Sequence, residues 1–182
     1  MKRILLIRMS SLGDIIHTFP AVTDLRRALP EAELDWVVEE AYVPLARMHP
    51  GATRVVPFAL RRWGRALAAP STWREMAAFR REMRSGRDYD AILDTQGLLK
   101  SAAVACLARG PVHGFGRHTA REPLAVRCYD FTYEFDASDH KIQRYRAVAS
   151  RALGYAPGAL DYGISAPPRP AAAPPSPYCV LL

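Results

Sequence analysis

Short apolar runs alternate with longer helical patterns through the first 116 residues, and this alternation constrains the fold more than any other feature of the chain. The apolar runs predict buried strands at residues 2–9, 33–40, 53–58, 90–96 and 112–116. The segments between them predict helices at 14–29, 41–48, 72–85 and 98–108. Strands that alternate with helices form parallel sheets through crossover connections. The sequence therefore predicts an α/β fold, with a doubly wound, Rossmann-like parallel sheet that carries helices on both faces.

The character of the chain changes after a last predicted helix at 138–153. Residues 166–177 are rich in proline and predict an extended linker, and the apolar residues 178–182 are strand-like. We expect an N-terminal domain at 1–165, the linker, and in 178–182 the first strand of a second domain that lies outside this chain. An alternative is that this strand folds back onto the edge of the first sheet.

Composition limits the classes of function. The formal net charge is +7, and lysine occurs only at Lys2, Lys100 and Lys141, so nearly all of the positive charge is arginine. Guanidinium groups match phosphates with paired hydrogen bonds, although a GC-rich coding sequence would also enrich arginine. The apolar run Ile4–Ile7 is too short for a signal peptide or a membrane span. We expect a protein of the cytoplasmic side.

Several well-known motifs are absent from the sequence. Neither G-x-G-x-x-G nor G-x-x-x-x-G-K-[ST] occurs, so dinucleotide and Walker-type phosphate loops are not predicted. H-E-x-x-H and G-x-S-x-G are absent too. The three cysteines form no C-x-x-C pair, so we expect no structural metal.

The loop after the first predicted strand reads SSLGD and holds Ser10, Ser11, Gly13 and Asp14. Gly13 fits a backbone with positive φ or a close approach to a ligand. Asp14 stands where a helix begins, so it fits an N-cap that stabilises the helix by about 1 kcal/mol. It also fits a general base at the carboxyl end of a strand, where doubly wound sheets bind ligands. Spacing alone leaves both roles open.

Basic residues gather in two further stretches that follow predicted strands. Residues 59–65 contain Arg61, Arg62, Trp63 and Arg65, which predict an anion site or a solvated helix start. Residues 94–100 place Gln96 and Lys100 around a strand-to-helix turn. Later in the chain stand Arg121 and, four residues apart on one predicted helix face, His140 and Arg144.

Taken in order, these segments resemble the type I lipopolysaccharide heptosyltransferases of glycosyltransferase family 9. The resemblance rests on SSLGDIIHTFPAVTDL, DWVVEE, RRWGRA, DTQGLLKSA, HTAREPLA and the H-x-x-x-R of His140 and Arg144. It implies the N-terminal, acceptor-binding half of a two-domain GT-B enzyme, working without cofactor or metal. The implied donor is ADP-heptose and the implied acceptor is the Kdo of Kdo2-lipid A. The implied place is the cytoplasmic face of the inner membrane of a Gram-negative cell, with peripheral membrane contact.

The resemblance also assigns roles to residues. The family's catalytic base falls on Asp14, and its basic acceptor-binding residues fall on Arg61, Arg62, Arg121 and His140. With the residues singled out above, the expected acceptor-binding set is Ser10, Ser11, Gly13, Arg61, Arg62, Arg65, Gln96, Lys100, Arg121, His140 and Arg144. Two departures stand out: Gly64 and Arg65 replace two successive basic residues, and Arg8 replaces a common lysine.

Two other functions remain as alternatives. A type II heptosyltransferase, acting on the first heptose, shares the family, but DWVVEE and HTAREPLA favour type I. A nucleic-acid-binding module would explain the positive charge, yet no nucleic-acid motif occurs, so we expect no nucleic-acid partner. Since the implied donor site belongs to the second domain, we expect no turnover by residues 1–182 alone.

Overall fold

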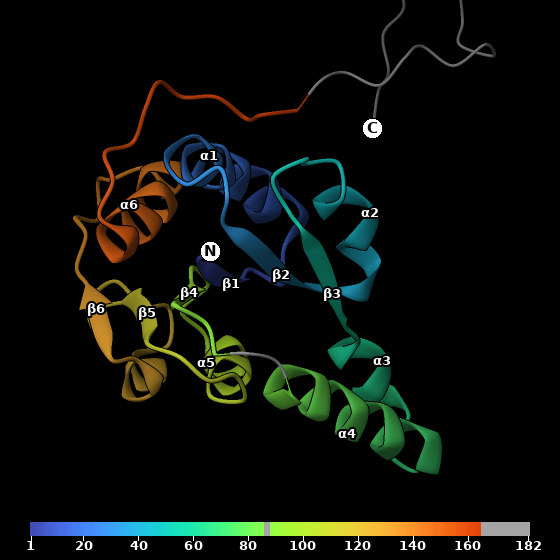
Figure 1. Cartoon of the computed structure of the whole chain (residues 1–182). Helices are drawn as coiled ribbons and strands as arrows, with labels where there is room; N and C mark the ends of the chain where they lie inside the picture. The colour runs from blue at the N-terminus through green and yellow to red at the C-terminus, as the bar shows by residue number, and fades with distance from the viewer. Residues whose placement is uncertain (86–87, 165–182) are drawn as a thin grey trace, which may run out of the picture.

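The computed structural model describes residues 1–85 and 88–164 and contains one six-stranded, fully parallel sheet with the strand order β3-β2-β1-β4-β5-β6 (Figure 1). The strands are β1 (Arg3–Ile7), β2 (Glu33–Glu39), β3 (Arg54–Phe58), β4 (Ala91–Asp94), β5 (Val112–Phe115) and β6 (Phe131–Tyr133). The α-helices are α1 (Leu12–Ala28), α2 (Val43–Ala46), α3 (Leu60–Arg65), α4 (Pro70–Ser85), α5 (Leu99–Ala105) and α6 (Lys141–Leu153). Two 3₁₀ helices, η1 (Glu40–Tyr42) and η2 (Pro123–Cys128), complete the described elements.

The apolar strands are buried on both faces because helices cover both. In β1, Ile4 and Leu6 belong to one hydrophobic core, and the alternate residues Leu5 and Ile7 belong to the other. The first core includes side chains of α1 and α6, and the second includes side chains of α3, α4 and α5. Successive side chains of a strand point to opposite faces. The doubly wound arrangement predicted from the sequence is confirmed.

Several element boundaries differ from the prediction. The edge strand β6 was not predicted, because it has only three residues and they are largely exposed. Helix α6 begins at Lys141 with His140 as its N-cap, rather than at residue 138. Pro20 lies inside the continuous α1, where it is buried. Residues 166–177 and 178–182, predicted as linker and strand, lie outside the described residues.

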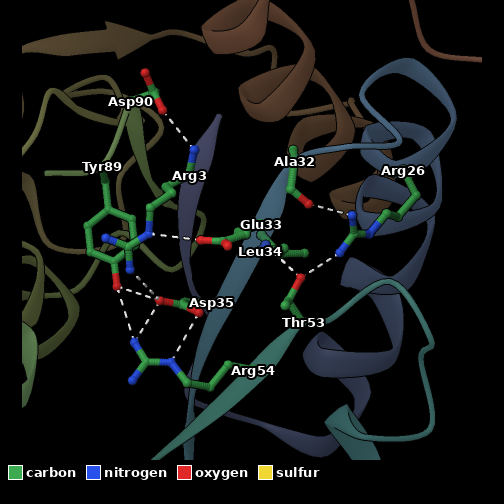
Figure 2. Close-up of polar contacts among 10 residues, drawn as sticks. All are labelled: Arg3, Arg26, Ala32, Glu33, Leu34, Asp35, Thr53, Arg54, Tyr89 and Asp90. Atoms are coloured by element: carbon green, nitrogen blue, oxygen red, sulfur yellow. Dashed lines mark hydrogen bonds and ion pairs between the residues drawn. The ribbon is translucent and has the colours of Figure 1, made fainter. Parts of the chain in front are cut away.

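A polar cluster holds the amino-terminal ends of β1, β2 and β3 together (Figure 2). The buried carboxylate of Asp35 accepts hydrogen bonds from Arg54 Nη2 at 2.6 Å and from the Tyr89 hydroxyl at 2.6 Å. Arg3 contributes a longer ion pair to the same carboxylate at 3.5 Å. Because buried carboxylates are costly without partners, this cluster fixes the register of the three strands. It lies at the opposite end of the strands from the loops discussed below.

His49 is buried beneath α1 and should stay neutral. Its Nδ1 accepts a hydrogen bond from the Gly51 N–H at 2.9 Å, and its Nε2 lies 2.9 Å from the Thr23 hydroxyl. Burial, helped by the charge of Arg26, lowers the pKa of His49 from 6.5 to about 4. Because the pKa of His49 is lower in the folded chain than in the unfolded chain, protonation at low pH favours unfolding. The stability that the neutral, buried His49 contributes is therefore complete above pH 6.5. It is lost as the pH falls from 6.5 through 4.

We therefore expect the imidazole resonances of His49 to titrate with a midpoint near pH 4 in an NMR pH series of the folded chain. The free energy of unfolding should show a matching fall below pH 6.5 that is absent in His49→Gln. A midpoint near 6.5 would show that the ring is accessible to water and would contradict the buried, neutral histidine.

Candidate functional site

The strand order reverses between β1 and β4, and the loops that leave these two strands border a cavity of about 400 Å³. In open α/β sheets, such a switch point at the carboxyl ends of the strands is where ligands bind. The cavity is lined by Arg8, Ser10, Ser11, Asp14, Thr95, Gln96, Leu98, Lys100, Phe115, Thr119, Arg121, Lys141, Arg144 and Tyr145. These residues come from the segments after β1, β4 and β5 and from the first turns of α6.

Asp94 shapes the loop after β4. Its buried carboxylate accepts hydrogen bonds from the backbone N–H groups of Gln96 at 2.8 Å and Gly97 at 3.2 Å, and from the Tyr129 hydroxyl at 2.7 Å. Gly97 has a φ of +68°, which L-residues with a side chain adopt only with strain. Asp94 is therefore an internal support of the turn.

Several hydrogen bonds tie the loop after β4 and the start of α5 to the loop after β1. Gln96 Oε1 accepts from the Met9 N–H at 2.9 Å, and Lys100 Nζ donates to Ser10 Oγ at 3.3 Å. Gln96 Nε2 also lies 3.4 Å from Ser10 Oγ. Residues 9–10 and 96–100, which follow two of the predicted strands, thus meet at one edge of the sheet.

Asp14 lies in the first turn of α1, and Ser11 occupies the N-cap position. The interpretation of Asp14 as the N-cap is therefore wrong by three residues. Its Oδ1 accepts a hydrogen bond from the Tyr145 hydroxyl at 3.2 Å and lies 3.5 Å from Lys141 Nζ. Its Oδ2 lies 3.4 Å from Ser11 Oγ. The carboxylate is thus held on the cavity wall by α1 and α6 together.

Arg8 is the buried cation of the cavity. Its side chain is almost entirely enclosed, at 3% exposure, and its guanidinium carbon lies 4.0 Å from the centre of the Tyr145 ring. Nε donates to Thr95 Oγ1 at 3.3 Å, while Nη2 is buried without a hydrogen-bond partner within the described residues. A buried N–H without a partner is costly. The arrangement suits an anionic or hydroxyl-bearing ligand that completes the hydrogen bonding of Arg8.

The charges of the cavity keep Asp14 ionised. Burial raises the pKa of Asp14, but the positive charges of Arg8 and Lys141 and the hydrogen bonds of Ser11 and Tyr145 lower it further, to below the ordinary 3.8. The amino-terminal end of α1 acts in the same direction. At neutral pH the site therefore presents one carboxylate able to accept a proton, surrounded by cations that suit an acidic ligand.

Removing the charge of Lys141 should raise the pKa of Asp14. Lys141 is 63% exposed, so Lys141→Met should leave the fold intact. We expect the carboxyl carbon of Asp14 to titrate at higher pH in this variant, in a ¹³C-detected NMR series. Lys2→Met, at the amino terminus, serves as the control and should leave the titration unchanged. Equal midpoints in all three proteins would contradict the electrostatic coupling.

Seven of the predicted site residues line the cavity, and five do not. Those on its wall are Ser10, Ser11, Asp14, Gln96, Lys100, Arg121 and Arg144, and those away from it are Gly13, Arg61, Arg62, Arg65 and His140. The expectation of a positive φ at Gly13 is wrong, because this residue is part of α1 and has no positive φ. A Cβ atom added at Gly13 would meet no other atom within 4 Å. Space for a ligand's approach remains open at this position.

Arg62 of α3 pairs with acidic side chains in this structure. Arg62 forms ion pairs with Glu40 at 3.1 Å and Glu75 at 2.8 Å. Trp63 is buried against Phe58 and Phe79, so it packs in the core and does not stack on a sugar. The roles of Arg61, Arg62 and Arg65 in acceptor binding stay predictions.

His140 and Arg144 do not point to a common target. His140 caps α6 by accepting a hydrogen bond from the Ile142 N–H at 3.3 Å, and Arg144 donates to the carbonyl groups of residues 136, 137 and 139. Only Arg144 lines the cavity. Sequence reasoning missed Lys141 and Tyr145 of α6, and it named Arg8 only as the replacement of a common lysine, not as a residue of the site.

Within residues 1–85 and 88–164, no group of three or more His, Cys, Asp or Glu side chains is placed to hold a metal ion. In the same part of the chain, none of the helices combines the length and the apolar character that crossing a bilayer requires.

Comparison with known proteins gives concordant matches. A family model described as glycosyltransferase family 9 (heptosyltransferase) matches residues 76–181. The lipopolysaccharide heptosyltransferase 1 of Pseudomonas aeruginosa is 42% identical over 99% of this chain and 51% of its own length. The enzyme of the same name from Escherichia coli K12 is 42% identical over 84% of this chain and 48% of its own length.

Solved structures agree with this result. The Escherichia coli heptosyltransferase WaaC with ADP superposes with a TM-score of 0.83 at 40% identity, over 88% of this chain and 51% of that protein. The same enzyme with ADP-2-deoxy-2-fluoro heptose gives 0.82 over the same shares. Escherichia coli heptosyltransferase II is 21% identical with a TM-score of 0.59, which shows a common fold. The chain spans about half the length of the curated relatives it matches.

Proposed function

Because the chain belongs to glycosyltransferase family 9, the heptosyltransferases, we propose that it is the acceptor-binding half of an inverting heptosyltransferase of type I. The reaction is transfer of L-glycero-D-manno-heptose from ADP-heptose to the Kdo of Kdo2-lipid A, in the synthesis of the lipopolysaccharide core. The Pseudomonas aeruginosa and Escherichia coli K12 relatives that carry this name are 42% identical to the chain, and a structure of Escherichia coli heptosyltransferase WaaC holds ADP-2-deoxy-2-fluoro heptose.

One observation carries the proposal at the level of chemistry: the ionised Asp14 is the single carboxylate among the residues that line the cavity, and five of the others are cationic. Kdo is an acidic sugar with several hydroxyl groups. Arg8, Lys100 and Arg121 suit its carboxylate, and the hydroxyls of Ser10 and Ser11 suit its hydroxyls. Asp14 then lies beside the bound sugar, one hydroxyl group of which has to lose a proton.

A Kdo hydroxyl oxygen attacks the anomeric carbon of the heptose, while the bond from that carbon to the ADP oxygen breaks and its electron pair leaves with ADP. The proton of the attacking hydroxyl goes to Asp14. Tyr145 and Lys141 act as positioning residues, since they hold Oδ1 and leave the carboxylate ionised at neutral pH. The step uses no metal or cofactor.

The donor belongs to the second half of the enzyme in this proposal. We assign residues 1–165 to the acceptor domain, 166–177 to the linker and 178–182 to the start of the donor domain, as the sequence predicts. The whole enzyme works on the cytoplasmic side, at the surface of the inner membrane. The chain of residues 1–182 alone is then expected to bind acceptor without transferring heptose.

The test uses a two-half enzyme, in which this chain is joined to the C-terminal half of the Pseudomonas aeruginosa relative. We expect it to transfer heptose from ADP-heptose to Kdo2-lipid A, and the chain alone to form no product. Transfer only to an acceptor that already carries the first heptose would contradict type I and support type II. A properly folded two-half enzyme that binds ADP-heptose but transfers to neither acceptor would overturn the proposal.

A further inference from the structure

A second cavity, of about 480 Å³, lies between α3, α4 and α5, and we call it the α4 groove. Every residue that lines it is apolar except Arg80 and Lys100. Lys100 also lines the cavity that holds Asp14, so the two hollows share this side chain. A ligand with a polar part in the first cavity thus has an apolar surface next to it. Figure 1 shows α4 at the edge of the molecule, beside α3.

The rim of the α4 groove carries exposed apolar side chains that are held in place. Trp73 is 57% exposed and Leu67 is 52% exposed. The indole N–H of Trp73 donates to the Leu67 carbonyl at 2.8 Å, which fixes the ring beside the groove. Tryptophan with one end apolar and one end hydrogen-bonded is typical of the boundary between membrane and water.

The outer surface of α4 is basic, because the acidic residues of this helix are paired with arginines of other elements. Its two acidic residues are matched by arginines from neighbouring elements: Glu75 pairs with Arg62 at 2.8 Å and Glu82 with Arg54 at 2.9 Å. Four arginines of α4, including Arg74, are exposed and form no ion pair among the described residues, and three of them line a hollow of their own together with Ala77. These three are Arg80, Arg81 and Arg84.

We propose that α4 is the surface by which the domain docks on an anionic lipid bilayer. The α4 groove takes one acyl chain of a lipid, and Arg80, Arg81 and Arg84 contact the lipid phosphates. Arg80 lies on the same surface of α4 as Trp73 and Met76, so apolar and basic side chains stand next to one another there, as acyl chains and lipid phosphates do at a bilayer surface. The inference rests on the proposed function in one respect: the shared Lys100 brings a lipid-borne sugar from the bilayer to Asp14.

The test measures lipid binding by the chain itself. Vesicles of phosphatidylglycerol and phosphatidylcholine are compared with vesicles of phosphatidylcholine alone in a flotation assay. Dibrominated acyl chains then report an acyl chain in the groove, because Trp63 and Trp73 both line it, whereas Trp36 does not and is 0% exposed. We expect binding to the anionic vesicles and quenching of tryptophan fluorescence that is clearly smaller in Trp73→Phe.

Two variants separate the charge from the groove. Reversing Arg80, Arg81 and Arg84 to glutamate should weaken vesicle binding by about a hundredfold, at roughly fivefold for each lost arginine. Ala103→Glu, at an exposed position on the wall of the groove, should abolish the quenching of Trp73. The matched control reverses the exposed Arg47, Arg117 and Arg127, which changes the net charge equally and should leave most of the binding intact.

Several results would overturn the inference. They are equal losses in both triple variants, absence of quenching by the brominated chains, or an α4 surface that instead forms a dimer of this chain or binds RNA in the same assays. Kdo binding in the Asp14 cavity, measured on the same variants, separates the two proposals. Vesicle binding lost with Kdo binding retained leaves the proposed function standing and confirms α4 as the docking surface. Vesicle binding without any Kdo binding rejects the proposed function alone.

Discussion

Replacing Asp14 with asparagine in the two-half enzyme is expected to lower the rate of heptose transfer by about 10²–10⁴-fold, the usual contribution of a positioned general base. The amide keeps the size of the side chain and can still meet the Tyr145 hydroxyl, but it cannot take a proton from the acceptor. The measurement is product formation from ADP-heptose and Kdo2-lipid A under saturating conditions.

Kdo binding and stability provide the controls for this variant. Asp14→Asn should bind Kdo with an affinity close to that of the parent, because the arginine and lysine side chains of the cavity remain. Asp88→Asn, in an exposed ion pair with Arg109, should leave transfer unchanged. Transfer by Asp14→Asn at the rate of the parent would remove Asp14 from the role of base.

The second large effect is expected on stability, from the buried ion pair that joins α1 to α6. Arg146 Nε lies 2.6 Å from Asp24 Oδ2 and Nη2 lies 3.2 Å from Oδ1, and both residues are nearly fully buried, at 4% and 3% exposure. Asp24→Asn leaves the guanidinium buried without a counter-charge. We expect the free energy of unfolding in urea to fall by about 3–5 kcal/mol.

An exposed pair of the same chemistry is the control for Asp24. Arg27 and Asp161 form an ion pair in which both side chains are about half exposed to water. Asp161→Asn should change the stability little, since water and salt screen such pairs. If Asp24→Asn and Asp161→Asn lowered the free energy of unfolding by similar amounts, burial would not be what makes the pair of Asp24 and Arg146 important. Because α1 carries Asp14 and α6 carries Tyr145, Asp24→Asn should also broaden the Tyr145 and Asp14 signals in NMR spectra.

The strands of the sheet were predictable because each one is indicated by a run of neighbouring residues in the sequence. Runs such as Ile4–Ile7 are apolar at every position, and only a strand with helices on both faces buries them all. The meeting of Ser10 with Lys100 was predictable as well, since the carboxyl ends of parallel strands share one edge. Helix ends were less accurate: the position of Asp14 relative to the N-cap depends on three residues of loop geometry that the sequence does not specify.

The parts of the site that escaped prediction depend on contacts distant in the sequence. The contact between Tyr145 and Asp14 spans 131 positions, and nothing in the residues near either one indicates it. The burial of Arg8 likewise follows from the Tyr145 ring, which α6 brings over the end of β1. The sequence predicted that Arg62 would bind an anionic ligand, but its guanidinium forms ion pairs with Glu40 and Glu75 in the folded chain.

The central claim is that the cavity at the switch point between β1 and β4 binds an acidic sugar beside Asp14. An NMR titration of the isotope-labelled chain with Kdo tests it most directly, because it needs neither the donor half nor a lipid. We predict saturable shifts of the backbone amides at residues 8–14 and 95–100 and at Arg121, reduced in Arg8→Met. Shifts confined to α4, or none at saturating Kdo in the folded chain, would contradict it.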